Sequence, residues 1–158
     1  MRPNNRVTAA FALALAGSLA ACGSAVAPAR PAADPIAALV TRVNEYRSSI
    51  GCPGLRWHGP LSEVAQRHSE DMVQRDFFGH VNPDGESPFD RMRRAGIRWN
   101  GPAAENLAAF IERPETVLQR WLESPGHRAN LEDCRYRHHA IGLSEGRWTH
   151  LLLSRPEN

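Results

Sequence analysis

The chain contains no lysine, because all 19 of its cationic side chains are arginines. These arginines are spread along 158 residues without a basic block, and the formal net charge is only +2. The sequence therefore lacks the footprint of a nucleic-acid-binding protein. Arginine with abundant alanine, proline and glycine is simply typical of a GC-rich genome. The hydrophobic content of 42% excludes a disordered chain and predicts one globular domain with a tail.

The chain also lacks an apolar run that spans a bilayer comfortably, since spanning needs roughly 20 apolar residues. The run from Val7 to Leu19 is shorter. It follows two arginines and precedes small residues, a pattern that predicts a secretory signal.

The sequence Leu-Ala-Ala-Cys at the end of this segment resembles the lipobox of bacterial lipoproteins. The resemblance implies a lipoprotein signal peptide over residues 1–21, cleavage before Cys22, and acyl chains on Cys22. The protein would then be anchored at the outer face of the bacterial cell membrane. Ordinary signal cleavage after Ala21, which would give a secreted protein with an idle Cys22 thiol, is the alternative.

Residues 22–35 are mostly alanine, proline and other small residues, which predicts a semi-rigid tether before a domain over residues 36–155. Helices are expected to begin at Asp34-Pro35, Pro60, Ser87-Pro88 and Pro114. The fourth is expected to end in the Ser-Pro-Gly turn of residues 124–126. Strands are expected at residues 97–99 and 105–110, and as a hairpin of residues 140–143 and 148–153. This order predicts an α+β sandwich with a mainly antiparallel sheet.

Cysteine is scarce, with three residues in all. If Cys22 carries lipid, Cys52 and Cys134 form an even pair, which favours a disulfide in an exported domain. The alternative is two free thiols, one of them nucleophilic beside His138 or His139. The motifs Gly-x-Ser-x-Gly and His-Glu-x-x-His are both missing, so a catalytic or metal site would depend on the finished fold.

Four stretches of the sequence resemble the CAP superfamily, which contains cysteine-rich secretory proteins, antigen 5 and pathogenesis-related 1 proteins. The match is to its bacterial, SCP-like branch, and the stretches are Val-Asn-Glu-Tyr-Arg at 43–47, Asp-Phe-Phe-Gly-His at 76–80, Ala-Glu-Asn-Leu at 104–107 and Ser-Pro-Gly-His-Arg-Ala-Asn-Leu at 124–131. The resemblance covers residues 36–155. It implies a three-layer α-β-α sandwich and a cleft in which two histidines and two glutamates hold a divalent metal.

The resemblance transfers to two residues directly. His80 corresponds to the first family histidine, and Glu105 to the glutamate of a Gly-Glu-Asn motif whose glycine is Ala104 here. The second family glutamate falls at Ser124, and Glu123 lies one residue early. From the residues alone, Glu105 is a metal ligand, a general base or a surface charge at the start of a strand.

The second family histidine corresponds to Arg147, and the bacterial motif offers His127 in its place. The predicted metal site is therefore His80, Glu105 and His127. Two histidines and one carboxylate are the minimum set for a catalytic zinc, so zinc is the favoured ion. No residue is assigned a catalytic role.

Two classes of function remain open. The first is a non-enzymatic binding module, monomeric and anchored to the membrane, whose His/Glu cleft takes a divalent metal, a lipid or an envelope component. The second is a metal- or His/Glu-dependent extracytoplasmic hydrolase of peptide or envelope polymer. With one family glutamate in place, a hydrolase lacks an obvious base, so the sequence favours binding. A nucleic-acid partner is not expected.

Overall fold

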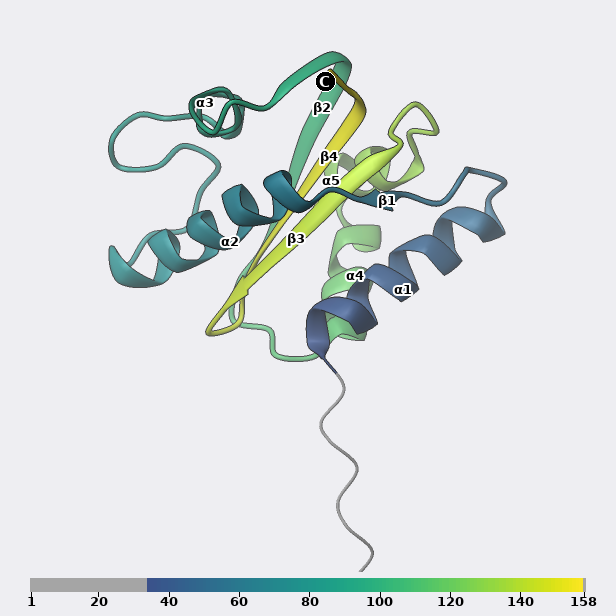
Figure 1. Cartoon of the computed structure of the whole chain (residues 1–158). Helices are drawn as coiled ribbons and strands as arrows, with labels where there is room; N and C mark the ends of the chain where they lie inside the picture. Colours follow the sequence, from purple (N-terminus) through teal and green to yellow (C-terminus); the bar gives the residue numbers. More distant parts are fainter. Residues whose placement is uncertain (1–33, 158) are drawn as a thin grey trace, which may run out of the picture. The chain divides into compact units, whose positions relative to one another are not determined.

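The computed structural model describes residues 34–157, so the predicted signal peptide, Cys22 and most of the predicted tether lie outside the described residues. Five helices and four strands follow one another in this part of the chain (Figure 1). In chain order they are α1 Pro35–Ser49, β1 Arg56–Trp57, α2 Gly59–Gln74, α3 Pro88–Arg94, β2 Arg98–Ala108, α4 Pro114–Glu123, α5 Pro125–Glu132, β3 His138–Ser144 and β4 Arg147–Glu157. Between residues 34 and 157, no helix has the length and apolar character to cross a membrane.

Each of the five helices has a proline in its first turn, where the missing N–H would have no helical partner. The Asp34 side chain caps α1 by accepting a hydrogen bond from the Ile36 backbone N–H at 2.9 Å. At α3, Ser87 and Asp90 form a reciprocal capping box. The four predicted helix starts are therefore confirmed, and local side-chain chemistry explains them.

Pro125 was expected to end a helix, and that expectation is wrong, because Pro125 begins α5. Helix α4 ends at Glu123, and Ser124 takes an extended backbone with φ −92° and ψ 118°. A residue before proline is pushed out of the helical region, whereas the proline itself fits a first helical turn. His127 consequently lies in the first turn of α5, not in a surface turn.

The sheet has the strand order β1-β3-β4-β2. Strands β3 and β4 form the predicted hairpin, β2 pairs with β4 antiparallel, and β1 pairs with β3 in parallel. The two strands expected at residues 97–99 and 105–110 belong to the single strand β2, whose register shifts between Asn100 and Ala103. Because β2 pairs with β4 alone, it is an edge strand of the sheet.

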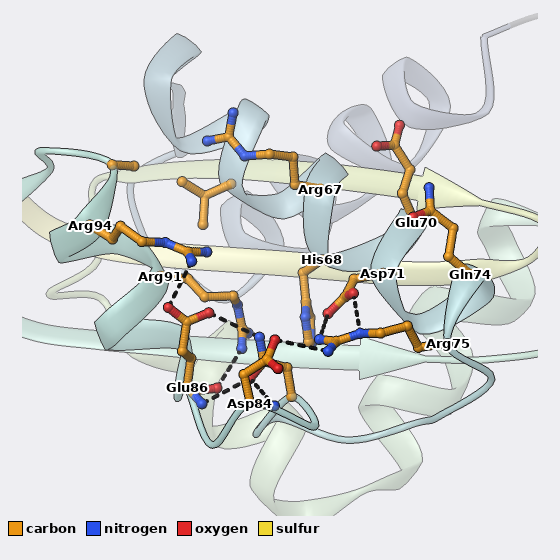
Figure 2. A pocket seen from close by; sticks show the side chains of 13 residues that line it. Arg67, His68, Glu70, Asp71, Gln74, Arg75, Asp84, Glu86, Arg91 and Arg94 are labelled. Atoms are coloured by element: carbon orange, nitrogen blue, oxygen red, sulfur yellow. Dashed lines mark hydrogen bonds and ion pairs between the residues drawn. The ribbon is translucent and has the colours of Figure 1, made fainter.

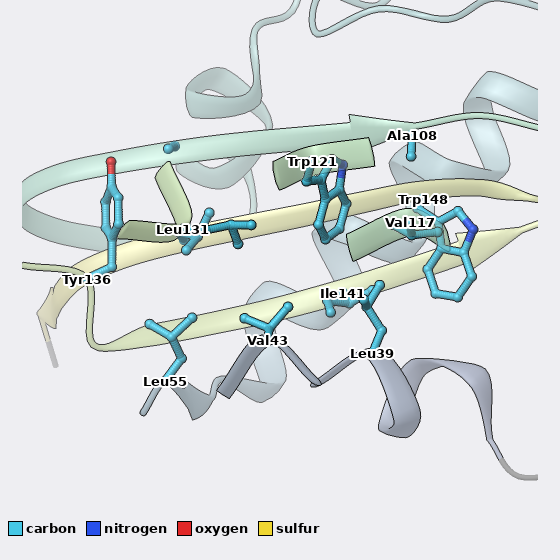
Figure 3. Close-up of a cluster of buried hydrophobic side chains, with 12 residues drawn as sticks. Leu39, Val43, Leu55, Ala108, Val117, Trp121, Leu131, Tyr136, Ile141 and Trp148 are labelled. Carbon is cyan, nitrogen blue, oxygen red and sulfur yellow. The ribbon is translucent and has the colours of Figure 1, made fainter. Parts of the chain in front are cut away.

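Helices cover both faces of the sheet, which confirms the three-layer α-β-α sandwich. On one face, α1, α4 and α5 contribute to a cluster that includes Leu39, Trp121, Ile141 and Trp148 (Figure 3). On the other face, α2 and α3 pack with alternate residues of the same strands. Gly142 permits this packing, since a Cβ there would lie 2.4 Å from the Ala65 backbone of α2.

The predicted disulfide is present between Cys52 and Cys134, whose Cα atoms lie 5.0 Å apart. The alternative of two free thiols is therefore wrong. Beside the disulfide, the fully buried Arg47 donates hydrogen bonds to the backbone carbonyls of Pro53, Leu131, Asp133 and Tyr136. Together they tie the end of α1 to the segment that follows α5.

Two histidines of neighbouring strands form a buried pair in the core. His139 Nδ1 of β3 lies 3.1 Å from His150 Nε2 of β4, and the His150 ring stacks on Trp121. Burial, with smaller effects of Arg47 and His138, lowers the pKa of His139 to about 4. Burial also holds the pKa of His150 well below its ordinary value, so both rings are neutral at pH 7.

Candidate functional site

The loop between α2 and α3 carries His80, and hydrogen bonds fix its path. Asn82 Oδ1 accepts hydrogen bonds from the backbone N–H groups of Asp84 and Glu86, a compact turn made by one side chain. Arg91 Nη1 of α3 donates to the carbonyl oxygens of His80 and Glu86, at 2.8 and 3.0 Å. The backbone at His80 is thus held against a helix, although it belongs to a loop.

Glu105 of β2 connects His80 to Arg91. Its Oε1 lies 2.8 Å from His80 Nδ1, and its Oε2 accepts a hydrogen bond from Arg91 Nη2 at 2.8 Å. The Glu105 side chain is 1% exposed, whereas that of His80 is 51% exposed. The carboxylate is therefore a buried, fully engaged anchor, and the ring it holds has its Nε2 edge available to a ligand.

Asn106, the next residue of β2, holds His127. Its Nδ2 donates to the His127 carbonyl oxygen at 3.1 Å, and its Oδ1 accepts a hydrogen bond from Asn130 Nδ2 at 2.8 Å. The N-terminal part of α5 is thereby fixed against the edge strand. Burial, and then the nearby charge of His80, lower the pKa of His127.

Of the three predicted site residues, His80 and Glu105 are in direct contact, and the backbone of His127 is bound by Asn106, the neighbour of Glu105 in β2. The positions that departed from the family pattern make other contacts. Glu123 pairs with Arg120 in α4, and Arg147 pairs with Asp76 and lies over the Phe110 ring. Within residues 34–157, no group of three or more His, Cys, Asp and Glu side chains is placed to share a metal ion. Glu105 is engaged by His80 and Arg91, so its predicted role as a direct ligand stays a prediction.

The contact between His80 and Glu105 is one that also occurs at metal sites. A metal-binding histidine typically gives its second ring nitrogen to a carboxylate, which fixes the ring and its tautomer. His80 and Glu105 have this relationship. His127 supplies a second neutral imidazole close enough for electrostatic coupling to His80.

A hollow of about 660 Å³ adjoins this network (Figure 2). Its lining comes from α2, the following loop and α3, and Arg91 is common to the hollow and the network. Ion pairs of Arg75 with Asp71 and Asp84, and of Arg94 with Glu86, surround it. The lining is thus strongly polar, and its charges largely neutralise one another.

Sequence reasoning missed Arg91, which joins the loop, the strand and the hollow. It lies in a run of three arginines in four positions, and its neighbours Arg93 and Arg94 are exposed. Only the packing of α3 against the sheet separates the buried arginine from the two exposed ones.

Comparison with known proteins identifies the domain. The sequence pattern of the cysteine-rich secretory protein (CAP) family matches residues 40–149. A Bacillus subtilis protein, described as uncharacterized and named YkwD, is 33% identical over 119 residues, which cover 74% of this chain and 46% of that protein. The chain thus spans less than half of this relative.

Solved structures show the same fold. An extracellular protein from Bacillus anthracis that contains an SCP domain superimposes with a TM-score of 0.73 and 29% identity, over 77% of this chain and 40% of that chain. An outer surface protein from Borrelia burgdorferi gives a TM-score of 0.67 over 77% of this chain and 92% of that chain. Its identity of 22% makes it evidence of fold alone.

Proposed function

Because the chain belongs to the cysteine-rich secretory protein (CAP) family, we propose that it is an exported binding module, anchored by lipid at Cys22. Its His80–His127 site takes a divalent metal, with zinc preferred, and its ligand is a polar component of the cell envelope. The observation that carries the proposal is the 2.8 Å contact between His80 Nδ1 and the buried Glu105 carboxylate, which leaves the other ring nitrogen of the half-exposed His80 side chain available to a ligand.

In this proposal His80 and His127 hold the metal, and Glu105 orients His80. A zinc ion held by two histidines keeps coordination positions for oxygen atoms of a ligand, which it would polarise as a Lewis acid. Since the pKa of His127 is lowered from its ordinary value of 6.5, this ring is a neutral donor at pH 7. Metal affinity should therefore fall as the pH is lowered into the range in which imidazoles protonate.

The arrangement supports binding more than hydrolysis. Both carboxylate oxygens of Glu105 are engaged, by His80 and by the buried Arg91, so Glu105 is a poor general base. The adjoining hollow is lined mostly by charged and amide side chains, which suits a polar envelope component better than an acyl chain.

Anchoring rests on the signal-like N-terminus that ends in Leu-Ala-Ala-Cys, and export is further supported by the similarity to the extracellular SCP-domain protein from Bacillus anthracis. Mass spectrometry of the protein from its native host should find acyl groups on Cys22. A mature protein released with an unmodified Cys22 thiol would remove the anchor from the proposal and leave a secreted protein.

The metal site is tested by zinc calorimetry at pH 7.5 on the wild type, His80→Ala and His127→Ala. Each substitution should lower the zinc affinity at least tenfold, because it removes one of two ligands. The matched control is His138→Ala, which removes a partly exposed histidine of β3 and should bind zinc as the wild type does. Wild-type protein that binds no zinc, or site variants that bind like the control, would refute the metal site.

A further inference from the structure

Arginines that are scattered along the sequence gather at one end of the sheet. Arg56 begins β1, Arg135 and Arg137 precede β3, and Arg155 lies near the end of β4. The strand directions bring these positions together, since β1 and β3 start where β4 ends. This is the end of the sheet at which the described chain terminates (Figure 1).

Two hollows of about 430 and 310 Å³ lie among these arginines and share Arg137, Ser154 and Arg155. Arg135 belongs to the first hollow, and Arg56 to the second. Because the two hollows have a common wall, we refer to both together as the arginine groove. No aspartate or glutamate lines either hollow.

The positive charge of the arginine groove is largely uncompensated. Arg135 forms an ion pair with Asp133, but within residues 34–157 Arg56, Arg137 and Arg155 have no carboxylate within ion-pair distance. Like charges gathered without counter-charges create a local positive potential that attracts anions. The pKa of His138, which lines the groove, is lowered first by burial and then by the positive charges of His58 and Arg56.

Part of the groove is rigid. The Arg137 guanidinium donates to the backbone carbonyls of Cys134 and Tyr136, next to the disulfide. Gly101 has a φ of +92°, and a Cβ there would lie 2.7 Å from Ser154 Oγ. The Gly101 backbone thus lies close to the Ser154 side chain, and a larger residue at position 101 would disturb this wall.

We propose that the arginine groove binds phosphate groups of an anionic polymer outside the cytoplasm. Guanidinium groups match phosphate oxygens with paired hydrogen bonds, and several arginines around one groove suit several phosphates of one chain. No phenylalanine, tyrosine or tryptophan lines the groove, so it lacks the stacking surfaces that single-stranded nucleic acid requires. The groove shares no residue with the His80–Glu105–Arg91 network, so this proposal stands apart from the metal site.

Binding of linear polyphosphate to the purified mature protein tests the proposal, by calorimetry at several salt concentrations. The double variant Arg56→Gln/Arg155→Gln removes two groove charges and none of the side-chain hydrogen bonds described in residues 34–157. Its affinity should fall at least tenfold, and the slope of log affinity against log salt should decrease by about two. The matched control Arg67→Gln/Arg120→Gln removes two exposed arginines elsewhere and should retain the wild-type affinity.

The outcomes are distinct. The proposal is supported if polyphosphate binding is lost in the groove variant and retained in the control variant. It is also supported if the double variant His80→Ala/His127→Ala binds polyphosphate as the wild type does. No wild-type binding, or equal losses in groove and control variants, overturns it. Vesicles of phosphatidylglycerol test whether the phosphate belongs to a lipid headgroup. A protein that binds these vesicles but not polyphosphate would recognise a membrane surface, and that result would overturn the proposal. Tenfold preference for a single-stranded oligonucleotide over polyphosphate of equal charge also overturns it.

Discussion

Glu105 and Asn106 are consecutive residues of β2 that hold the two histidines of the site from opposite faces of the sheet. Glu105 pairs in register with Leu151, which packs under α2 and α3, and it binds His80. Asn106 pairs with His150, which stacks on Trp121 of α4, and it binds the backbone of His127. Because side chains alternate along a strand, one short segment of an edge strand positions residues from two helical layers.

Glu105→Gln should destabilise the protein by about 3 to 5 kcal/mol, since the buried Arg91 guanidinium would lose its counter-charge. It should also weaken zinc binding by loosening His80. Urea unfolding measures the first effect. Glu123→Gln is the matched control, because its ion pair with Arg120 is exposed and should contribute less than about 1 kcal/mol. Equal losses in the two variants would contradict the role of the buried pair.

Asn106→Ala should cost about 1 to 3 kcal/mol, because it leaves polar groups of α5 without their partner. Zinc affinity should fall as well, since α5 positions His127. Asn130→Ala removes one of the two hydrogen bonds and should have the smaller effect on both quantities. An Asn106→Ala protein with wild-type zinc affinity would show that His127 does not depend on this contact.

The His139–His150 pair should make the fold sensitive to acid. Folding lowers both pKa values, so the unfolded state binds more protons once the pH drops below about 6.5. Stability is therefore complete above pH 6.5 and should fall as the pH approaches 4, by up to about 1.4 kcal/mol per pH unit for each histidine.

Urea unfolding at pH 7, 6, 5 and 4.5 measures this slope. His139→Gln should flatten it, whereas His138→Gln, which changes a partly exposed neighbour, should retain most of it. A wild-type protein equally stable at pH 7 and 4.5 would be inconsistent with a neutral buried pair.

Removal of the disulfide should lower the free energy of unfolding by about 4.5 kcal/mol in the chain-entropy model, because Cys52 and Cys134 are 82 positions apart. The double variant Cys52→Ala/Cys134→Ala measures this value without leaving a thiol. The control is Ser49→Ala, an exposed substitution near the end of α1, which should change the free energy of unfolding little. A loss below 1 kcal/mol would show that Arg47 alone ties the two segments.

Local signals explain which parts of the fold were predictable. Aspartate or serine caps and first-turn prolines gave the starts of α1, α2, α3 and α4, and alternating apolar residues gave the β3–β4 hairpin. Pro125 was predicted to end α4 because a proline that follows a helix commonly marks its end. The short helix α5 that Pro125 begins gave no separate signal. The three layers were predicted from the family resemblance, because a family pattern encodes tertiary structure that periodicity cannot. The same resemblance selected His80, Glu105 and His127, and the structure contains the His80–Glu105 contact.

Other features depend on contacts between distant segments. Nothing local distinguishes the buried Arg91 from its exposed neighbours, and the residues of the His139–His150 pair are eleven positions apart. The arginine groove is the clearest case, because it combines Arg56 with Arg155 only through strand pairing. The sequence showed no basic block, and the fold nevertheless assembles a cationic surface.

Anomalous diffraction at the zinc edge, from crystals grown with zinc and without chelator, tests the metal site most directly. The account predicts one strong peak bonded to His80 Nε2 and to His127, with His80 Nδ1 still in contact with Glu105. A zinc ion bound elsewhere, or no peak at this edge of β2, would contradict it.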